Sequence, residues 1–506
     1  MVKSSSSAPL PVIPLDPSSS TPLYRQVYEA LRTTILTHKW VPGTRLPSTR
    51  EMAQGLMISR NTIMNAYDQL LAEGYLEGLV GSGTYVTRSL PDELLYARVN
   101  PQRSLRLPEL GRGFSRRGLV ITKTPVNACP DPSKARPFWS GLPAVDAFPV
   151  QLWSRLIARH WNQSSRALLG YGDPGGYWPL REAIASYLGT ARAVQCSPEQ
   201  IIITSGRQQA FDLAMRVLLD PGDAAWIEDP GYMGARAALI GAGARLIPVP
   251  VDNEGIDVAA GVRECPEARL ACVSPSHQCP LGVTMSLARR LALLEWAKTA
   301  GAWILEDDYD SEYRYSGRPL SALQGLDQDG RVIYIGTFSK VMFPALRLGY
   351  LVVPPDKVNS YVTARALLSR FSPVIDQAAL SDFIQEGHFA RHVRRMRALY
   401  RSRQEILIKA LQRDLGGVIE VQPDEAGLHL VGWLPEDVDA EEVSQRAATY
   451  GVDAQPLSAF CLQPRGRGGL VLGYAGYDER QIRRGVRQLA LALRNVTSFA
   501  QARYSG

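Results

Sequence analysis

Two different hydrophobic patterns follow one another along the chain. Near the start, Leu23, Val27, Leu31 and Ile35 recur every four positions, which predicts one buried face of a helix. From residue 201 onward, short continuous apolar runs alternate with longer stretches of helical pattern. The first pattern is typical of a small helical domain and the second of an α/β sheet, so we expect at least two differently built domains.

Residues 21–88 carry start and stop signals for two more helices. Pro42-Gly43 ends the first pattern, and Ser48 with Glu51 three residues later forms a capping box for a helix that ends near Gly55. Ser59 can cap the next helix. The inward residues of that helix are expected to be Ile63, Ala66, Tyr67, Leu70 and Leu71.

A β-hairpin is predicted after these helices, because Tyr75 to Val86 reads as two short strands joined around Gly81-Ser-Gly83. Two helices joined by a short turn and followed by a hairpin describe a winged helix-turn-helix. Its last helix enters the DNA major groove with its N-terminal residues foremost. The candidate DNA-binding residues are Arg50, Arg60, Asn61, Thr62 and, at the wing, Gly83. The alternative is a helical oligomerisation domain with surface arginines.

Six apolar runs in the second region are predicted to be strands. They are Ile201–Thr204, Ala224–Glu228, Leu270–Ser274, Ala302–Glu306, Val332–Ile335 and Leu348–Val353. Most are separated by room for a helix, which favours right-handed crossovers and a largely parallel sheet. Ligands of such sheets bind at the loops beyond the strand carboxyl ends.

Length and composition set limits on the class of protein. The 506 residues suggest roughly three folding units, and 45% apolar with 21% charged residues is typical of a soluble globular protein. No apolar run approaches the about 18 residues of a membrane helix. Residues 1–20, rich in Ser and Pro, are expected to form a disordered arm rather than a signal peptide. The six scattered cysteines include no CxxC pair, so we expect reduced thiols, no metal site and a cytoplasmic protein.

The positive charge is concentrated in the first quarter of the chain. Residues 21–88 carry seven Lys/Arg against five Asp/Glu, and residues 89–137 carry nine against four. A polyanion would therefore bind this end. Residues 89–137 lack clear periodicity and are expected to form a basic, mostly extended linker. Arg112, Arg116 and Arg117 either add phosphate contacts or lie on the large domain.

The candidate chemistry lies in loops that follow predicted strands. Ser205-Gly206-Arg207 opens a helix, whose N-terminal amides make a natural phosphate cradle. Asp307 and Tyr309 follow another strand, and Lys340 follows a third in Thr337-Phe-Ser-Lys, with Arg347 seven residues on. A lysine, a phosphate cradle, an acid and aromatic rings are what pyridoxal 5'-phosphate (PLP) requires.

The first region resembles the GntR family of winged-helix regulators. The match runs from Gly43-Thr-Arg-Leu-Pro-Ser to Gly81-Ser-Gly-Thr-Tyr-Val. The resemblance implies that Arg50, Arg60 and Thr62 contact double-stranded operator DNA and that Gly83 marks the wing.

The second region resembles fold-type I aminotransferases, and the whole arrangement resembles the MocR/GabR subfamily of GntR regulators. The resemblance implies that Lys340 forms the Schiff base with PLP, Asp307 pairs with the pyridine nitrogen, Tyr309 bonds the phenolic oxygen and Tyr232 stacks on the ring. It implies a phosphate site of Ser205, Gly206, Arg207, Thr337, Ser339 and Arg347. Tyr171 would reach the phosphate of a partner subunit, which implies a homodimer. The large domain would span residues 138–370 and the small domain residues 371–506.

Two positions depart from the aminotransferase pattern. The loop that holds an asparagine before Pro-Thr-Gly reads Ser276-His-Gln-Cys-Pro-Leu-Gly here, so either His277 or Gln278 takes the place of the asparagine at the cofactor. Val471 stands where an arginine would clamp the α-carboxylate of the ligand. Either Arg465 or Arg467 replaces that arginine, or the ligand is another amine, a sulfonate or PLP itself.

These observations predict a PLP-dependent, DNA-binding transcriptional regulator that senses an amino compound or PLP, and not an enzyme. It would be cytoplasmic, and nucleoid-associated when bound to DNA. The alternative is a catalytically active aminotransferase that carries a DNA-binding domain. A third possibility is a repressor whose PLP domain serves only as a dimerisation scaffold.

Overall fold

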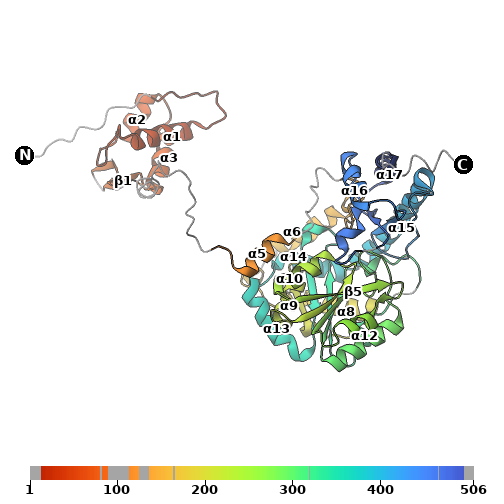
Figure 1. Ribbon diagram of the computed structural model, residues 1–506. Coiled ribbons are helices and arrows are strands. Elements are labelled where there is room, and N and C mark those ends of the chain that lie inside the picture. The colour runs from red at the N-terminus through yellow and green to blue at the C-terminus, as the bar shows by residue number, and fades with distance from the viewer. Residues whose placement is uncertain are drawn as a thin grey trace, which may run out of the picture. The chain divides into compact units, whose positions relative to one another are not determined.

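The computed structural model describes residues 13–79, 82–88, 90, 113–124, 136–162, 166–317, 320–464 and 466–494. The chain divides into two compact units, residues 1–113 and 114–506 (Figure 1). The helices of the first unit are α1 (Leu23–Leu36), α2 (Thr49–Leu56) and α3 (Arg60–Ala72), and its strands are β1 (Leu76–Leu79) and β2 (Gly83–Val86).

The second unit alternates helices with strands over most of its length. Its helices are α5 (Arg116–Lys123), α6 (Val150–Asn162), α7 (Arg166–Leu169), α8 (Trp178–Arg192), α9 (Arg207–Leu218), α10 (Met233–Ala242), α11 (Val258–Glu264), α12 (Leu287–Ala300), α13 (Val358–Ser369), α14 (Val374–Gln385), α15 (His388–Leu415), α16 (Ala440–Thr449) and α17 (Glu479–Arg494). Its strands are β3 (Ile201–Thr204), β4 (Ala224–Asp229), β5 (Arg245–Asp252), β6 (Gly255–Ile256), β7 (Leu270–Val273), β8 (Trp303–Asp308), β9 (Val332–Thr337), β10 (Gly349–Val352), β11 (His429–Trp433), β12 (Gln455–Pro456) and β13 (Gly469–Gly473).

The first unit is a winged helix-turn-helix, as predicted. The capping box at α2 is present, because Ser48 Oγ accepts from Glu51 N at 3.2 Å and Glu51 Oε2 accepts from Ser48 N at 2.8 Å. Ser59 Oγ caps α3 by accepting from Thr62 N at 3.1 Å. The antiparallel hairpin β1–β2 follows α3. Local side-chain caps therefore fix where both helices of the motif begin.

Two segments differ from the expectation. Within residues 13–20, Ile13 and Leu15 pack against the core of the first unit, so this part does not form a disordered arm. Residues 1–12 lie outside the described residues. Residues 116–123 form α5, which we did not expect in the linker. Arg117 Nε donates to Gly241 O at 2.7 Å, so this arginine lies on the surface of the second unit. Arg112 lies outside the described residues.

An eight-stranded sheet forms the centre of the second unit, in the order β3-β10-β9-β8-β7-β4-β5-β6. Strands β4, β5, β7, β8 and β9 run parallel, and β10 is antiparallel to both β3 and β9. The largely parallel sheet is thus confirmed. We missed β5, which contains Pro248 and Pro250. Proline cannot donate to a sheet, and β5 tolerates it near the edge, beside the two-residue strand β6.

Helices cover both faces of this sheet. Alternate residues of β4 point to opposite faces: Ile227 packs in a cluster with Phe211 of α9, whereas Trp226 packs in another with Leu293 of α12. The faces are therefore closed, and the loops at the strand ends are left to carry the polar chemistry.

The C-terminal part begins with α14 and the long α15 and ends with α17. Between them, β11, β13 and β12 form an antiparallel sheet in that order. Across the described ranges, we find no helix with the length and apolar character needed to cross a membrane.

Candidate functional site

The predicted DNA-reading residues lie at the N-termini of α2 and α3. Arg50, Arg60 and Asn61 are exposed, and Thr62 is half-buried. Arg60 Nε donates to Thr49 Oγ1 at 3.2 Å, which ties the start of α3 to the start of α2. Helix N-termini carry partial positive charge, so this face suits phosphates as well as base edges. The contact of these residues with DNA stays a prediction.

Gly83 begins the second strand of the wing with φ of +117°, a conformation that favours glycine. A Cβ at this position would lie 3.0 Å from Arg45 Nε, so the Arg45 side chain lies against the wing. Sequence reasoning missed Arg45. Arg45 belongs to the Gly43-Thr-Arg segment on which the resemblance to GntR regulators rests. No pattern in the neighbouring sequence indicates that its side chain lies against Gly83.

Lys340 follows β9, and its amine is turned inward. Nζ donates to Gly141 O at 2.7 Å. Burial, followed by the positive charge of Arg207, lowers the pKa of the amine to about 8. At neutral pH, more of this amine is therefore uncharged than for an ordinary lysine of pKa about 10.4. Only the uncharged form attacks a carbonyl carbon, so the site favours a nucleophilic lysine.

Arg207 brings together two of the predicted cofactor residues. Its Nη1 lies 3.0 Å from Asp307 Oδ2 and 3.3 Å from Oδ1. Its Cζ lies 3.8 Å from the centre of the Tyr232 ring. Burial raises the pKa of Asp307 to about 6, although Arg207 acts in the opposite direction. The backbone of Arg207 begins α9, as a phosphate cradle requires, but its side chain faces the acid instead.

The remaining residues of the predicted phosphate site gather around the start of α9. Gly206 has φ of +85°, and a Cβ there would lie 3.2 Å from Arg347 Cζ. Arg347 Nη2 donates to Ser205 O at 3.1 Å. Thr337 Oγ1 accepts from Ser339 N at 3.2 Å, whereas Ser339 Oγ is buried without a hydrogen-bond partner in the described part of the chain. An unpartnered hydroxyl, a helix N-terminus without a Cβ and a guanidinium fit a phosphate group.

Tyr171, predicted to reach a partner subunit, is 89% exposed. Its ring lies 6.1 Å from that of Phe371, edge to face. An exposed aromatic side chain suits contact with a second copy. Its role at a shared site stays a prediction.

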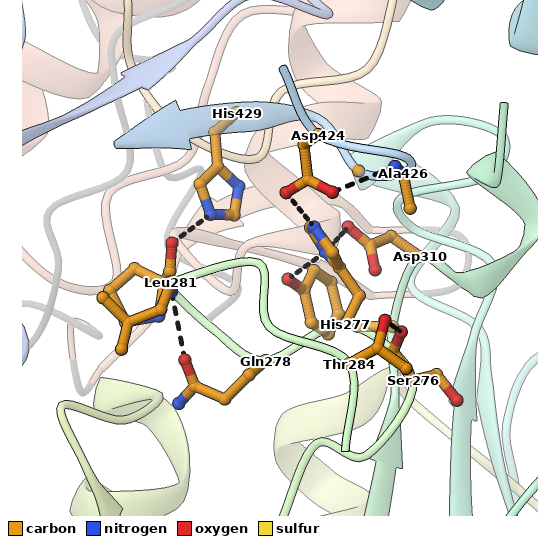
Figure 2. Close-up of polar contacts among 12 residues, drawn as sticks. Ser276, His277, Gln278, Leu281, Thr284, Asp310, Asp424, Ala426 and His429 are labelled. Carbon is orange, nitrogen blue, oxygen red and sulfur yellow. Dashed lines mark hydrogen bonds and ion pairs between the residues drawn. The ribbon is translucent and has the colours of Figure 1, made fainter. Parts of the chain in front are cut away.

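Tyr309 is buried and its hydroxyl lies beside His277, whose contacts with Asp310 and Asp424 are drawn in Figure 2. His277 Nδ1 is 3.0 Å from Tyr309 Oη and 3.0 Å from Asp310 Oδ2, and its Nε2 is 3.1 Å from Asp424 Oδ2. Burial alone would lower the pKa of His277, but Asp310 and Asp424 outweigh it and raise that pKa well above its ordinary value. His277 is thus held as a cation that contacts the Tyr309 hydroxyl, and the place of His277 at a cofactor stays a prediction.

Gln278 uses its amide within the protein, since Nε2 lies 3.2 Å from Glu228 Oε2 and 2.8 Å from Cys279 O. The residue directly before Pro280 is Cys279. Burial raises the pKa of its thiol to about 12, so the thiol is neutral at physiological pH. Cys279 packs against the cluster that contains Met233, the residue after Tyr232, which places it beside the site. Sequence reasoning missed Cys279, although counting back from Pro280 reaches it directly.

Val471 lies in the middle of β13 and is fully buried, opposite Val431 of β11 and Gln455 of β12. Arg467, one of the two suggested replacements for the missing arginine, pairs instead with Glu420, with Nη2 2.7 Å from Oε2. The other, Arg465, lies outside the described residues.

Two family models match the two units. Residues 23–86 match the bacterial regulatory proteins of the gntR family, and residues 144–489 match aminotransferase class I and II. The solved structures that resemble the chain include Pyrococcus horikoshii kynurenine aminotransferase in complex with PMP, with 30% identity and a TM-score of 0.66 over 72% of this chain and 92% of that chain. Another is LysN, the α-aminoadipate aminotransferase of Thermus thermophilus, complexed with N-(5'-phosphopyridoxyl)-L-leucine, with 32% identity and a TM-score of 0.65 over 71% and 91%. PLP is the usual cofactor of this family.

Curated relatives that match nearly the whole chain are regulators. The probable rhizopine catabolism regulatory protein MocR of Rhizobium meliloti is 43% identical over 94% of this chain and 95% of its own length. The pyridoxine biosynthesis regulator PdxR of Corynebacterium glutamicum is 32% identical over 94% and 97%. By contrast, the 2-aminoadipate transaminase of Thermus thermophilus, 32% identical, covers 72% of this chain and 91% of its own length. The chain therefore belongs to the MocR type of GntR-family transcriptional regulators, in which a DNA-binding winged helix-turn-helix precedes an aminotransferase-like unit.

Proposed function

We propose that this regulator binds PLP at Lys340 and operator DNA through α3, and that exchange of an amine at Lys340, or a change in PLP occupancy, shifts its DNA affinity. The observation that carries the proposal is the Lys340 amine, whose pKa is lowered to about 8 beside Asp307 and Arg207. Amines with a lowered pKa among charged partners cluster at reactive sites, which supports the proposal.

We assign different parts of PLP to different residues of the site. Asp307 supplies the carboxylate for the ring nitrogen, Tyr232 the aromatic face and Tyr309 a phenol. Arg207 now makes contacts with Asp307 and Tyr232, so its guanidinium and the ring nitrogen compete for one carboxylate. The set proposed for the phosphate is Ser205, Gly206, Arg207, Thr337, Ser339 and Arg347.

Lys340 is the residue that would hold PLP, through its Nζ. Bound PLP would supply an aldehyde carbon that condenses reversibly with primary amines. On release by a competing ligand amine, the Lys340 nitrogen would take up the proton that the ligand nitrogen gives away. This exchange needs no oxidant or reductant, so it would signal without turnover.

The exchange regulates only if the liganded and unliganded proteins bind DNA unequally. We propose a homodimer in which Tyr171 reaches the partner's site, bound to double-stranded operator DNA and hence located at the nucleoid. The name of the PdxR relative refers to pyridoxine biosynthesis, so PLP itself stays among the candidate effectors.

A working aminotransferase is the less supported alternative, because Val471 cannot bind the carboxylate of a second substrate.

The test measures DNA affinity of the full-length protein by fluorescence anisotropy, using the promoter region of its own gene, with and without PLP and a panel of amines. We expect a change of about 5- to 150-fold, the usual range of coupling, in the wild type. Lys298→Ala, a change at a surface lysine paired with Asp329, serves as the matched control and should respond like the wild type. Lys340→Ala should not respond. If PLP or an amine changed the DNA affinity of Lys340→Ala as much as that of the wild type, the second unit would serve only as a dimerisation scaffold.

A further inference from the structure

An apolar cluster surrounds Val471 at the junction of β13 with the loops of the large sheet. We call it the Val471 cluster. Its members are the buried Met233, Leu457, Phe460 and Val471, with the partly buried Cys279 and Leu281 packed against them.

This cluster borders the cofactor residues. Met233 directly follows Tyr232 in the chain. Tyr232 in turn lies against Arg207, whose Cζ is 3.8 Å from the centre of the Tyr232 ring. The turn before Tyr232 is tied to the cluster, because Gly231 N donates to Phe460 O at 3.0 Å. The Val471 cluster therefore forms a wall of the site that contains Lys340.

Two guanidinium groups that the described residues place near this wall, those of Arg467 and Arg236, already have partners. Arg467 binds Glu420 through Nη2 at 2.7 Å and Leu434 O through Nε at 3.0 Å. Arg236 donates to Cys461 O at 3.1 Å and to Ala459 O at 3.2 Å. Each of these two arginines would have to give up hydrogen bonds to reach a ligand.

A carboxylate placed against the Val471 cluster would lose its water without gaining an ion pair from Arg467 or Arg236, the two arginines described above. Burial of an unpaired charge is among the largest penalties in proteins. A hydrogen, an alkyl group or another neutral carbon substituent carries no such penalty, and apolar contact favours it.

We propose that the effector of this regulator is a primary amine whose amine-bearing carbon carries no carboxylate, and that the Val471 cluster excludes α-amino acids. The proposal rests on amine exchange at Lys340, which is part of the proposed function, and it names the chemical class that the exchange accepts. Val471 and Cys279 are then specificity-determining residues.

The experiment titrates the PLP-loaded, full-length protein with pairs of compounds that differ only in the α-carboxylate, followed by visible absorbance of the cofactor. The pairs are 3-methylbutylamine against L-leucine and 1,4-diaminobutane against L-ornithine. We expect the compound without the carboxylate to bind at least about tenfold more tightly in each pair. Equal or tighter binding of the amino acids would overturn the inference.

Variants test whether the Val471 cluster causes the preference for compounds without an α-carboxylate. Val471→Arg should reverse the preference, and Val471→Met, which changes shape without adding charge, should keep it. Because a buried arginine at position 471 threatens folding, Cys279→Asn is the second variant. The amide of the new asparagine should reduce the difference in affinity between the two compounds of each pair. Arg467→Ala should leave the preference unchanged. Weakened amino-acid binding in Arg467→Ala would make Arg467 the clamp and contradict the inference.

Different experimental outcomes would contradict this inference and the proposed function. If PLP occupancy alters DNA affinity but no amine perturbs the absorbance, the inference is wrong and the regulator senses PLP itself. If neither PLP nor any amine affects DNA binding, the proposed function falls and the inference falls with it.

Discussion

Replacing His277 by phenylalanine leaves Asp310 and Asp424 without the cation that lies between them. Removal of one partner from a buried ion pair costs about 3–5 kcal/mol. The Asp310 side chain is 1% exposed and that of Asp424 is 19% exposed, so water can reach only the second carboxylate. We therefore expect a loss near the lower end, about 3 kcal/mol in the free energy of unfolding. Phenylalanine fills the space of the ring, which limits the contribution of a cavity.

The loss should depend on pH in a direction that follows from the pKa of His277. The folded protein raises that pKa well above its ordinary value of 6.5. The stabilisation is then complete below pH about 6.5, where the unfolded imidazole is also protonated, and it declines as the pH rises through the folded pKa. The difference between wild type and His277→Phe should therefore shrink as the pH rises from 6 to 9.

His392 provides a matched control with the opposite sign. It is buried too, but its Nε2 lies 2.9 Å from Val341 O, and burial lowers its pKa below 6.5. Its stabilisation is present above pH about 6.5 and is lost as the pH falls through the folded pKa. Urea unfolding of the full-length wild type, His277→Phe and His392→Phe at several pH values measures both trends. A His277→Phe difference that stays constant or grows with rising pH would refute the cationic His277.

Three further predictions concern the caps, the DNA face and Lys340. Ser48→Ala removes the bond from Glu51 N to Ser48 Oγ but keeps the backbone N–H that donates to Glu51 Oε2, and it should destabilise the first unit by about 1 kcal/mol in thermal unfolding; an unchanged midpoint would contradict the side-chain cap. Arg60→Ala should weaken operator binding by about 1–3 kcal/mol in anisotropy titrations, whereas an equal loss on unrelated DNA would make Arg60 a phosphate contact only. The rate at which Lys340 captures PLP should rise with pH and level off above about 8 in stopped-flow absorbance, because the pKa of the amine is lowered to about 8; levelling only near 10 would show an ordinary lysine.

The sequence predicted features that depend on neighbours in the chain. The capping box at Ser48, the glycine at Gly83 and the placement of Lys340 after a strand all rest on patterns of a few residues. The same local reasoning missed β5, which contains Pro248 and Pro250 and lies near the sheet edge, where proline is tolerated. It also missed α5, a short helix whose apolar residues Leu119, Val120 and Ile121 are consecutive and exposed.

Contacts between distant segments could not be predicted in this way. Arg207 meets Asp307 across 100 residues, and His277 meets Asp424 across 147. Which side chain faces which partner depends on how the sheet and the C-terminal part pack, and no periodicity records it. The absence of an arginine at Val471 was visible in the sequence. The Val471 cluster could not be predicted from the sequence, because its residues come from four separate segments of the chain.

The central claim is that Lys340 chemistry and DNA binding are coupled in one molecule, and reciprocity tests it most directly. The measurement is the dissociation constant of an amine for the PLP-loaded protein, by absorbance, with and without saturating operator DNA. The same amine is then used to determine the dissociation constant for DNA. Linkage requires both constants to change by the same factor, and we predict equal factors well above one. An amine that alters the absorbance with the same affinity whether or not DNA is bound would contradict the account.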